Sequence, residues 1–230
     1  DKNNNITNRI VNQYNERNLL TKKLQYNGQG DILSYDTYNY DLNNNPIKQV
    51  TYSGDGSMQQ QVLYVYNNKN RITKETCILS DGTIVYCNGY DYDDNGNVKK
   101  LIVYNLQNST IIDEYILYTR AADGTVTESN VYNANNVLIE KEVYNNAGFI
   151  TEYYAFSATG VMTLEEKMRY DANHLLIQQE TTTYTESGSK ATYLCEQYND
   201  LKLVTVRIFE DFALQTYEQV LYQYNASMQV

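Results

Sequence analysis

The 230-residue chain has no tryptophan, one proline, one histidine and three cysteines. Three cysteines are too few for a fold held together by several disulfides. The single histidine, His174, has no cysteine or histidine partner at the spacing of a metal site, so it is expected to be an exposed loop residue. No apolar run approaches the roughly 18 residues that a membrane span needs, so membrane insertion is not expected.

Positive charge is also scarce. The formal net charge is −10 and the isoelectric point is about 4.6. Binding to nucleic acid or to an anionic membrane would need a basic stripe, and the sequence contains none. Neither kind of partner is therefore expected.

Tyrosine is abundant instead, with 25 copies, while the mean hydropathy is only −0.60. A tyrosine has an apolar ring and a polar tip, so it suits a surface that is half buried or wet on both sides. The composition therefore argues against a thick core of leucine, isoleucine and valine.

The tyrosines recur at a constant interval. A step of 26 residues, with one step of 28 before Tyr198, connects Tyr14, Tyr40, Tyr66, Tyr92, Tyr118, Tyr144, Tyr170, Tyr198 and Tyr224. A constant period is the signature of a repeat architecture. The sequence therefore predicts one array over residues 1–230, made of about nine 26-residue units.

Each repeat contains two turns and two candidate strands. One turn follows the pattern Tyr-Asn/Asp-x-x-Asn/Gly, as at Tyr92, and the other is centred on glycine, as at Gly82. The segments between turns have seven to nine residues and are rich in Val, Ile, Thr and Tyr, which is typical of strands. Residues 163–169 have helix-compatible composition, but the period favours a strand. Loops this short make neighbouring strands antiparallel. The fold class is therefore all-β: about 17 strands in tandem antiparallel β-hairpin repeats, forming one long twisted or spiralling sheet.

In such a sheet, residues 26 apart lie on alternate strands with the same face exposed. This register predicts tyrosine rows, and the candidate binding residues are Tyr38, Tyr40, Tyr64, Tyr66, Tyr90 and Tyr92. A lysine row is formed by Lys22, Lys48, Lys74 and Lys100. Exposed aromatic rows can stack on sugar rings or grip a protein. The alternative is that they pair across strands and only hold a thin sheet together.

Two cysteines, Cys77 and Cys87, flank the turn at Gly82 symmetrically. If they face each other across the hairpin, they lie at disulfide distance. Two free thiols are the alternative.

Catalytic and metal-binding signals are weak. Asp91, Asp93 and Asn95 resemble the first half of a calcium loop, but the twelfth position is Ile102 and not the required glutamate. The carboxylate pairs Glu140/Glu142 and Glu165/Glu166 are the kind that solvated strands supply routinely. We therefore expect no metal, no cofactor and no enzymatic activity. The remaining alternative, a hydrolase fragment, predicts a pocket where carboxylates converge.

The pattern Tyr-Asp-x-x-Gly-x-Val, clearest at Tyr92 and again at Tyr144, resembles the YD repeats of the RHS family over nearly the whole chain. Proteins of that family build spiralling sheets from β-hairpins. Some form hollow shells around a toxic cargo in bacteria, and others form extracellular barrels on animal cells. The chain differs in its longer period and in lacking the arginine common after the turn glycine.

The resemblance implies a non-enzymatic structural or interaction module of a secreted or cell-surface protein, similar to a shell wall. A carbohydrate-binding module that uses the tyrosine rows is the alternative. The expected partners are a protein or glycan at a cell surface, and other copies of the chain joined through sheet edges.

Overall fold

A computed structural model of the chain describes residues 8–224, and every regular element in that range is a β-strand. The strands are β1 (Asn8–Tyr14), β2 (Leu20–Asn27), β3 (Ile32–Tyr40), β4 (Pro46–Ser53), β5 (Met58–Tyr66), β6 (Ile72–Leu79), β7 (Ile84–Tyr92), β8 (Val98–Tyr104), β9 (Ile112–Arg120), β10 (Val126–Asn133), β11 (Leu138–Tyr144), β12 (Ile150–Phe156), β13 (Met162–Tyr170), β14 (Leu176–Tyr184), β15 (Lys190–Tyr198), β16 (Val204–Asp211) and β17 (Thr216–Leu221). Within residues 8–224 we find no helix with the length and apolar character of a membrane span.

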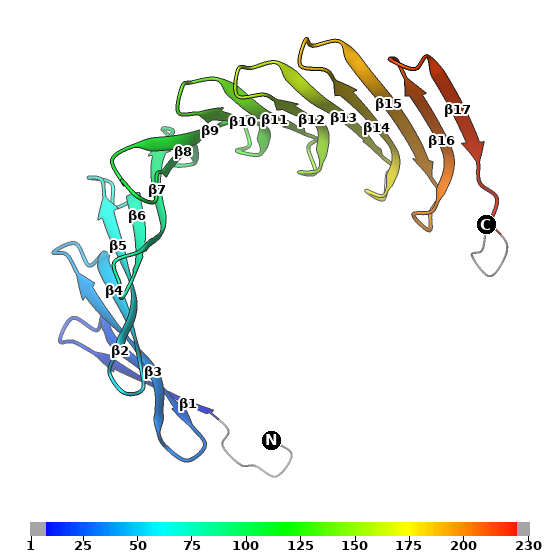
Figure 1. The fold of residues 1–230 in the computed structure, drawn as a ribbon. Helices are drawn as coiled ribbons and strands as arrows, with labels where there is room; N and C mark the ends of the chain where they lie inside the picture. The colour runs from blue at the N-terminus through cyan, green and yellow to red at the C-terminus, as the bar shows by residue number, and fades with distance from the viewer. Residues whose placement is uncertain (1–7, 225–230) are drawn as a thin grey trace. The chain divides into compact units, whose positions relative to one another are not determined.

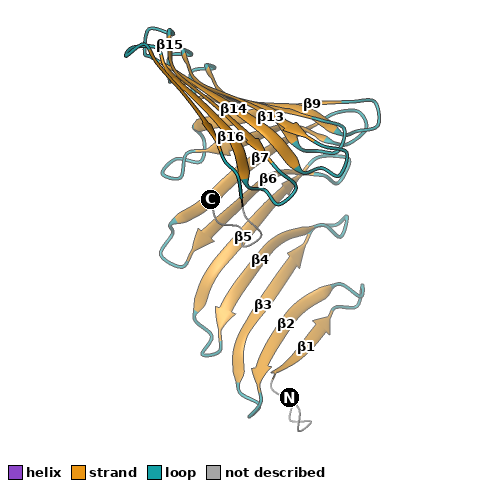
Figure 2. Ribbon diagram, turned by 90° about the vertical axis from the view of Figure 1, so that its right-hand side faces the viewer, coloured by secondary structure: helices purple, strands orange, loops and turns teal. Residues whose placement is uncertain are grey.

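The chain divides into two units, residues 1–113 and 114–230, hereafter unit 1 and unit 2. In unit 1 consecutive strands pair antiparallel, from β1–β2 through β7–β8. In unit 2 consecutive strands pair in the same way, from β9–β10 through β16–β17 (Figure 1). Figure 2 shows β1–β5 as a single twisted layer. Each unit is therefore an up-and-down series of hairpins.

The turns explain why asparagine, aspartate and glycine recur. In the turn after β1, the Asn15 N–H donates to the Leu19 carbonyl at 3.0 Å, and the Asn15 side chain accepts the N–H groups of Arg17 and Leu19. The fourth turn residue, Asn18, has φ of 59°. Asparagine and glycine tolerate this left-handed conformation best. One residue before the turn, the register shifts between Gln13 and Tyr14, so each repeat begins with a β-bulge.

The sheet of unit 1 has two different faces. The register places Lys22, Lys48, Lys74 and Lys100 on one side, which we call the lysine face, and Tyr38, Tyr64 and Tyr90 on the other, the tyrosine face. Buried residues occur on both, with Leu24 and Val50 on the lysine face and Val62 and Cys77 on the tyrosine face. On each face, therefore, the small set of buried side chains is covered by longer side chains of the same face.

One longer turn interrupts the regular spacing. In the regular turns an N–H bonds to the carbonyl four residues later, but the Asn105 N–H bonds to the carbonyl of Ile111 at 2.9 Å. This turn is therefore two residues longer than the regular ones. The boundary between the two units falls just beyond this turn, after Asp113.

The predicted all-β class, the antiparallel hairpins and the 17 strands are confirmed. Residues 163–169 belong to strand β13, as the period indicated. The prediction that residues 1–230 form one array stays a prediction, because residues 1–7 and 225–230 lie outside the described range.

Candidate functional site

The recurring tyrosines have a shared role that the sequence analysis missed. The hydroxyl of Tyr40 donates to the backbone carbonyl of Leu20 at 2.7 Å. The same bond, always to the carbonyl 20 residues earlier, is made by Tyr66 to Pro46 (2.8 Å), Tyr92 to Ile72 (2.6 Å), Tyr170 to Ile150 (2.9 Å) and Tyr224 to Val204 (2.6 Å). We call this contact the repeat bond.

The accepting residue of the repeat bond lies opposite the tyrosine of the preceding repeat. Leu20 pairs with Tyr14, and Pro46 pairs with Tyr40. Each tyrosine that makes the repeat bond therefore reaches back to the bulge of the hairpin before it and supplies a donor to that bulge carbonyl. The predicted binding residues Tyr40, Tyr66 and Tyr92 thus have their hydroxyl groups engaged inside the sheet.

The second predicted row is also partly engaged. Tyr86 and Tyr90 both donate to the Glu75 carboxylate, at 2.8 and 3.3 Å. Burial first, and then the charge of Glu75, raises the pKa of Tyr64 and of Tyr90 above the ordinary tyrosine value. Tyr38, Tyr64 and Tyr90 are all half-buried, and Tyr64 and Tyr90 lie near the Glu75 carboxylate.

On the lysine face of unit 1, lysine ammonium groups lie over tyrosine rings. The Lys22 ammonium lies 4.0 Å from the centre of the Tyr35 ring, and Tyr35 stacks on Tyr52 at 4.7 Å. The Lys74 ammonium lies 4.2 Å from the centre of the Tyr104 ring. Gly89 permits this arrangement, because a side chain there would press against the Tyr104 ring. These cation–π contacts stabilise the sheet without a second layer.

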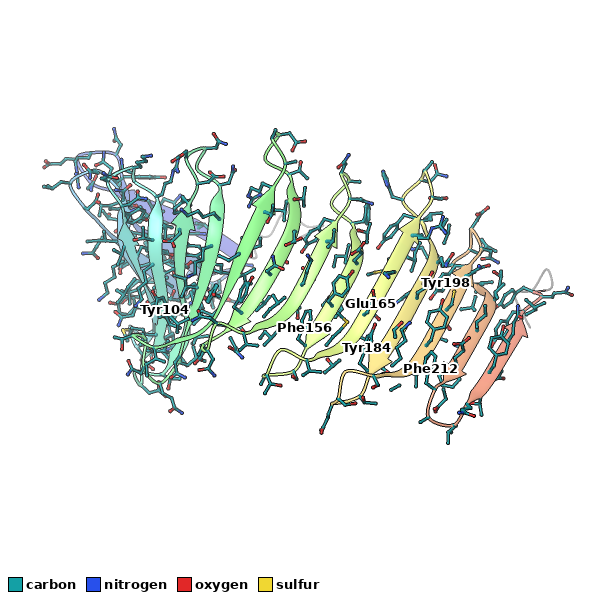
Figure 3. All side chains as sticks on the ribbon, turned by 90° about the horizontal axis from the view of Figure 1, so that it is seen from above. Tyr104, Phe156, Glu165, Tyr184, Tyr198 and Phe212 are labelled. Carbon is teal, nitrogen blue, oxygen red and sulfur yellow. The ribbon has the colours of Figure 1, made fainter. Side chains whose placement is uncertain are left out.

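Unit 2 has glutamates at two positions where the equivalent residues of unit 1 are tyrosines. Tyr144 donates to Glu142, two residues earlier on its own strand, and Tyr198 donates to Glu196 at 2.9 Å. Burial, and then this hydrogen bond, raises the pKa of Tyr198 to about 12. On the opposite face, Tyr184 on β14 donates to Glu165 on β13 at 2.9 Å, and the two side chains lie beside each other in Figure 3.

The predicted disulfide is wrong. Cys77 and Cys87 are buried free thiols, and so is Cys195. Cys87 pairs with Thr76, and Cys77 pairs with Tyr86, so the two cysteines lie on opposite faces of the sheet. The shift of one residue between Cys77 and Ile78 breaks the symmetry on which the disulfide prediction depended.

The carboxylates singled out in the sequence have structural contacts. Asp93, from the calcium-like segment, accepts the backbone N–H and the side-chain amide of Asn97 at 2.8 and 3.1 Å. Glu165 and Glu166 pair with successive residues of β12, so they point to opposite faces. Glu165 also forms an ion pair of 2.8 Å with Lys167.

Two equivalent hollows lie between successive tyrosine turns. In unit 1 a hollow of about 190 Å³ lies between the turns at Asn67 and Asp93, and in unit 2 one of about 620 Å³ lies between those at Asn145 and Asp171. Their linings correspond at an offset of three 26-residue repeats. Their positions on the sheet edge are therefore the same, and only their side chains differ.

The fifth turn residue differs between the two places. In unit 1 the Arg71 guanidinium lies 5.5 Å from the centre of the Tyr92 ring and contacts the position of Gly96. In unit 2 the equivalent residue is Phe149, whose ring centre lies 5.2 Å from the rings of both Tyr170 and His174. A second hollow of about 330 Å³ adjoins the first and shares Tyr170 and His174 with it.

His174 is exposed and lies in a turn, as expected from the sequence. Its φ of 63° places it at the fourth turn position, where most other repeats have asparagine or glycine. The substitution of histidine at this position, with phenylalanine at the fifth position of the preceding turn, is the sequence signal that would have located the hollow.

No family model matches the chain, and no curated protein matches it in sequence. Among solved structures, the chain is similar to the Photorhabdus luminescens Tc holotoxin pore, with a TM-score of 0.30, 13% identity, and coverage of 94% of this chain and 15% of that chain. A TcdB2–TccC3 crystal structure has a TM-score of 0.22 and 12% identity, with 88% and 16% coverage. A porin-like protein from Bacteroides uniformis has a TM-score of 0.35 and 9% identity, with 93% and 89% coverage.

The chain thus spans about a sixth of the two Tc toxin chains that it matches. All three TM-scores lie below 0.5, so these similarities do not assign the chain to a family.

Proposed function

We propose that the chain is a non-enzymatic structural and interaction repeat module of a secreted or cell-surface protein, comparable to the shell wall of RHS/YD-repeat proteins. The repeat bond is the observation that supports this proposal. It uses the most regular polar group of the sequence, the tyrosine hydroxyl, to connect a hairpin to the one before it, in both units. A tyrosine hydroxyl that donates to the backbone in this way stabilises the array, and ligand binding would then depend on other residues.

The described side chains fit this role. Tyrosine, glutamate and lysine side chains satisfy one another within a strand and across neighbouring strands, as in the contacts of Glu75 and of Glu165. Stability in such an array is approximately a sum of contributions from each repeat and its neighbours.

The expected partners are a protein or glycan at a cell surface, and further copies of the chain. β1 pairs only with β2, and β17 only with β16, among the strands that the structure describes. Their outer edges offer backbone groups to another strand, so association of copies through these edges is part of the proposal.

Carbohydrate binding is the second candidate. The hollows at the turn edge favour it, because they combine aromatic rings with amide and carboxylate groups. The tyrosine rows themselves are weaker candidates, since the hydroxyl groups of Tyr40, Tyr66, Tyr90 and Tyr92 are engaged.

Deletion of residues 41–66 tests the structural proposal. This deletion removes two strands and joins Tyr40 to the turn at Asn67, so the tyrosine period is kept. We expect the shortened chain to fold, with strand content preserved by circular dichroism. Deletion of residues 41–53 is the control, because it removes one strand and moves every later turn to the other edge. If both deletions unfold the chain equally, the repeat is not the unit of folding and the proposal fails.

A further inference from the structure

We infer that the two adjoining hollows of unit 2, those that share Tyr170 and His174, form a binding site for a neutral saccharide. This inference deepens the carbohydrate-binding candidate above and depends on it. It places the site at the turn edge of β11–β16, where Tyr170 belongs to the recurring tyrosine series but none of the six candidate binding tyrosines of the sequence lies. The two hollows measure about 620 and 330 Å³. These volumes lie in the range of small-molecule sites.

Aromatic rings gather at these hollows: Tyr170 and His174 line both of them, and Phe149 packs against these two rings. Phe149 is 37% exposed and contacts both Tyr170 and His174, with the His174 ring inclined by only 21° to it. The Tyr170 hydroxyl is held by the Ile150 carbonyl, so its ring cannot turn away. Rings that are already fixed can stack on the C–H face of a pyranose with little loss of side-chain freedom.

A carboxylate oxygen is available beside these rings. Oδ1 of Asp171 accepts the N–H groups of Asn173 and Leu175, both at 2.8 Å. In the equivalent turns the other oxygen accepts a side-chain amide, from Asn45 in one and Asn97 in another.

In the Asp171 turn that amide is replaced by the apolar side chain of Leu175. Among the described residues, Oδ2 of Asp171 therefore has no hydrogen-bond donor. A carboxylate oxygen at the edge of an aromatic surface is suited to accept the hydroxyl groups of a sugar. Asn146 and Arg169 line the same hollow and can donate to ring or hydroxyl oxygens.

The charge of unit 2 selects for a neutral ligand. Unit 2 contains 16 Asp and Glu but only 7 Lys and Arg. An anionic sugar would meet this field and the free oxygen of Asp171, so it is disfavoured.

The single histidine makes the site directly observable by NMR. We would label the full chain with ¹⁵N-histidine and titrate it with cello-, chito-, malto- and manno-oligosaccharides at millimolar concentration. At least one of them is expected to shift the imidazole signals of His174 in a saturable way. Oligogalacturonides, which are anionic, are expected to have no effect.

Matched variants locate the site. Phe149→Ala and Asp171→Asn should each weaken binding about tenfold, because they remove a stacking ring and a charged acceptor. Asparagine is native at the equivalent turn position in Asn67, so Asp171→Asn preserves the turn. Arg71→Ala and Asp93→Asn are the same changes in unit 1 and should leave the affinity unchanged.

Absence of a saturable shift with every neutral oligosaccharide overturns the inference. Equal losses in the two sets of variants overturn it too, as does binding of a proline-rich peptide but of no sugar. None of these results affects the proposed structural role, which the deletion of residues 41–66 tests separately.

Discussion

Unit 1 and unit 2 have the same hairpin architecture, but their tyrosine hydroxyl groups bond to different acceptors. In unit 1, Tyr66 and Tyr92 follow another tyrosine two residues earlier and make the repeat bond. In unit 2, Tyr144 and Tyr198 follow a glutamate at that position, and the carboxylate takes the hydroxyl instead. Tyr170 follows Met168, which cannot compete, and makes the repeat bond. The acceptor of each tyrosine hydroxyl therefore correlates with the residue two positions earlier: a glutamate there accepts the hydroxyl, whereas with tyrosine or methionine there the hydroxyl donates to the backbone carbonyl.

The hollows show the same division. Asp93 and Asp171 each accept the backbone N–H of the fifth turn residue, but Arg71 lines the hollow of unit 1, whereas its equivalent Phe149 packs against the Tyr170 ring of unit 2. Charge differs as well, since unit 1 has 11 basic and 12 acidic residues against 7 and 16 in unit 2. The comparison shows that the scaffold depends on a few positions in each repeat, while the remaining positions are free to differ.

Alkaline pH should have the largest effect, which is loss of the fold. The pKa values of Tyr66 and Tyr92 are raised, chiefly by burial, and that of Tyr198 is raised to about 12. Below pH 10 both folded and unfolded chains keep these protons, so the stabilisation is complete. Between about pH 10 and 12 the unfolded chain loses protons first, and stability falls. Tyrosinate absorbance and circular dichroism should therefore change together. Full tyrosine ionisation with the strands intact would contradict this prediction.

Gly54→Ala should unfold unit 1 selectively. A methyl group at Gly54 would overlap the backbone carbonyl oxygen of Ile32, and the cost should be about 3 kcal/mol. Hydrogen exchange should show lost protection in β2–β5 and unchanged protection in β11–β17. Gly30→Ala is the control. Gly30 has φ of 96° but open space around it, so only the backbone strain of about 1 kcal/mol applies. Equal loss of protection in both units of the Gly54→Ala variant would contradict this prediction, because it would mean that the two units unfold together.

Removal of single hydroxyl groups should give the smallest effects. Tyr66→Phe leaves the Pro46 carbonyl without this donor and should cost about 1 kcal/mol. Tyr144→Phe should cost less, because Glu142 still accepts the Ser129 hydroxyl at 3.0 Å. Tyr14→Phe, at a position 58% exposed, should be neutral. Urea unfolding of the three variants would measure the order. A larger loss for Tyr144→Phe than for Tyr66→Phe would contradict the distinction between the units.

The periodic features could be predicted from the sequence, and the local ones could not. The turn residues and the 26-residue period are sufficient to predict strands such as β5 and β13, because turn chemistry and alternation are local properties of the chain. The bulge at Cys77 is a shift of one residue that no composition reveals, and it reversed the expected geometry of the two cysteines. The repeat bond depends on the length of a tyrosine side chain across two strands, which needs coordinates. The binding role of Tyr38 and its equivalents stays a prediction.

The repeat bond has a consequence for how such a chain can grow. Where the repeat bond forms, the tyrosine of one hairpin needs only a carbonyl of the hairpin before it, so an added copy brings both its own donor and a new acceptor for whatever follows. Duplication of one segment can thus lengthen the protein without changes to the existing repeats. The turn residues of each new repeat can then diverge and acquire a different ligand preference.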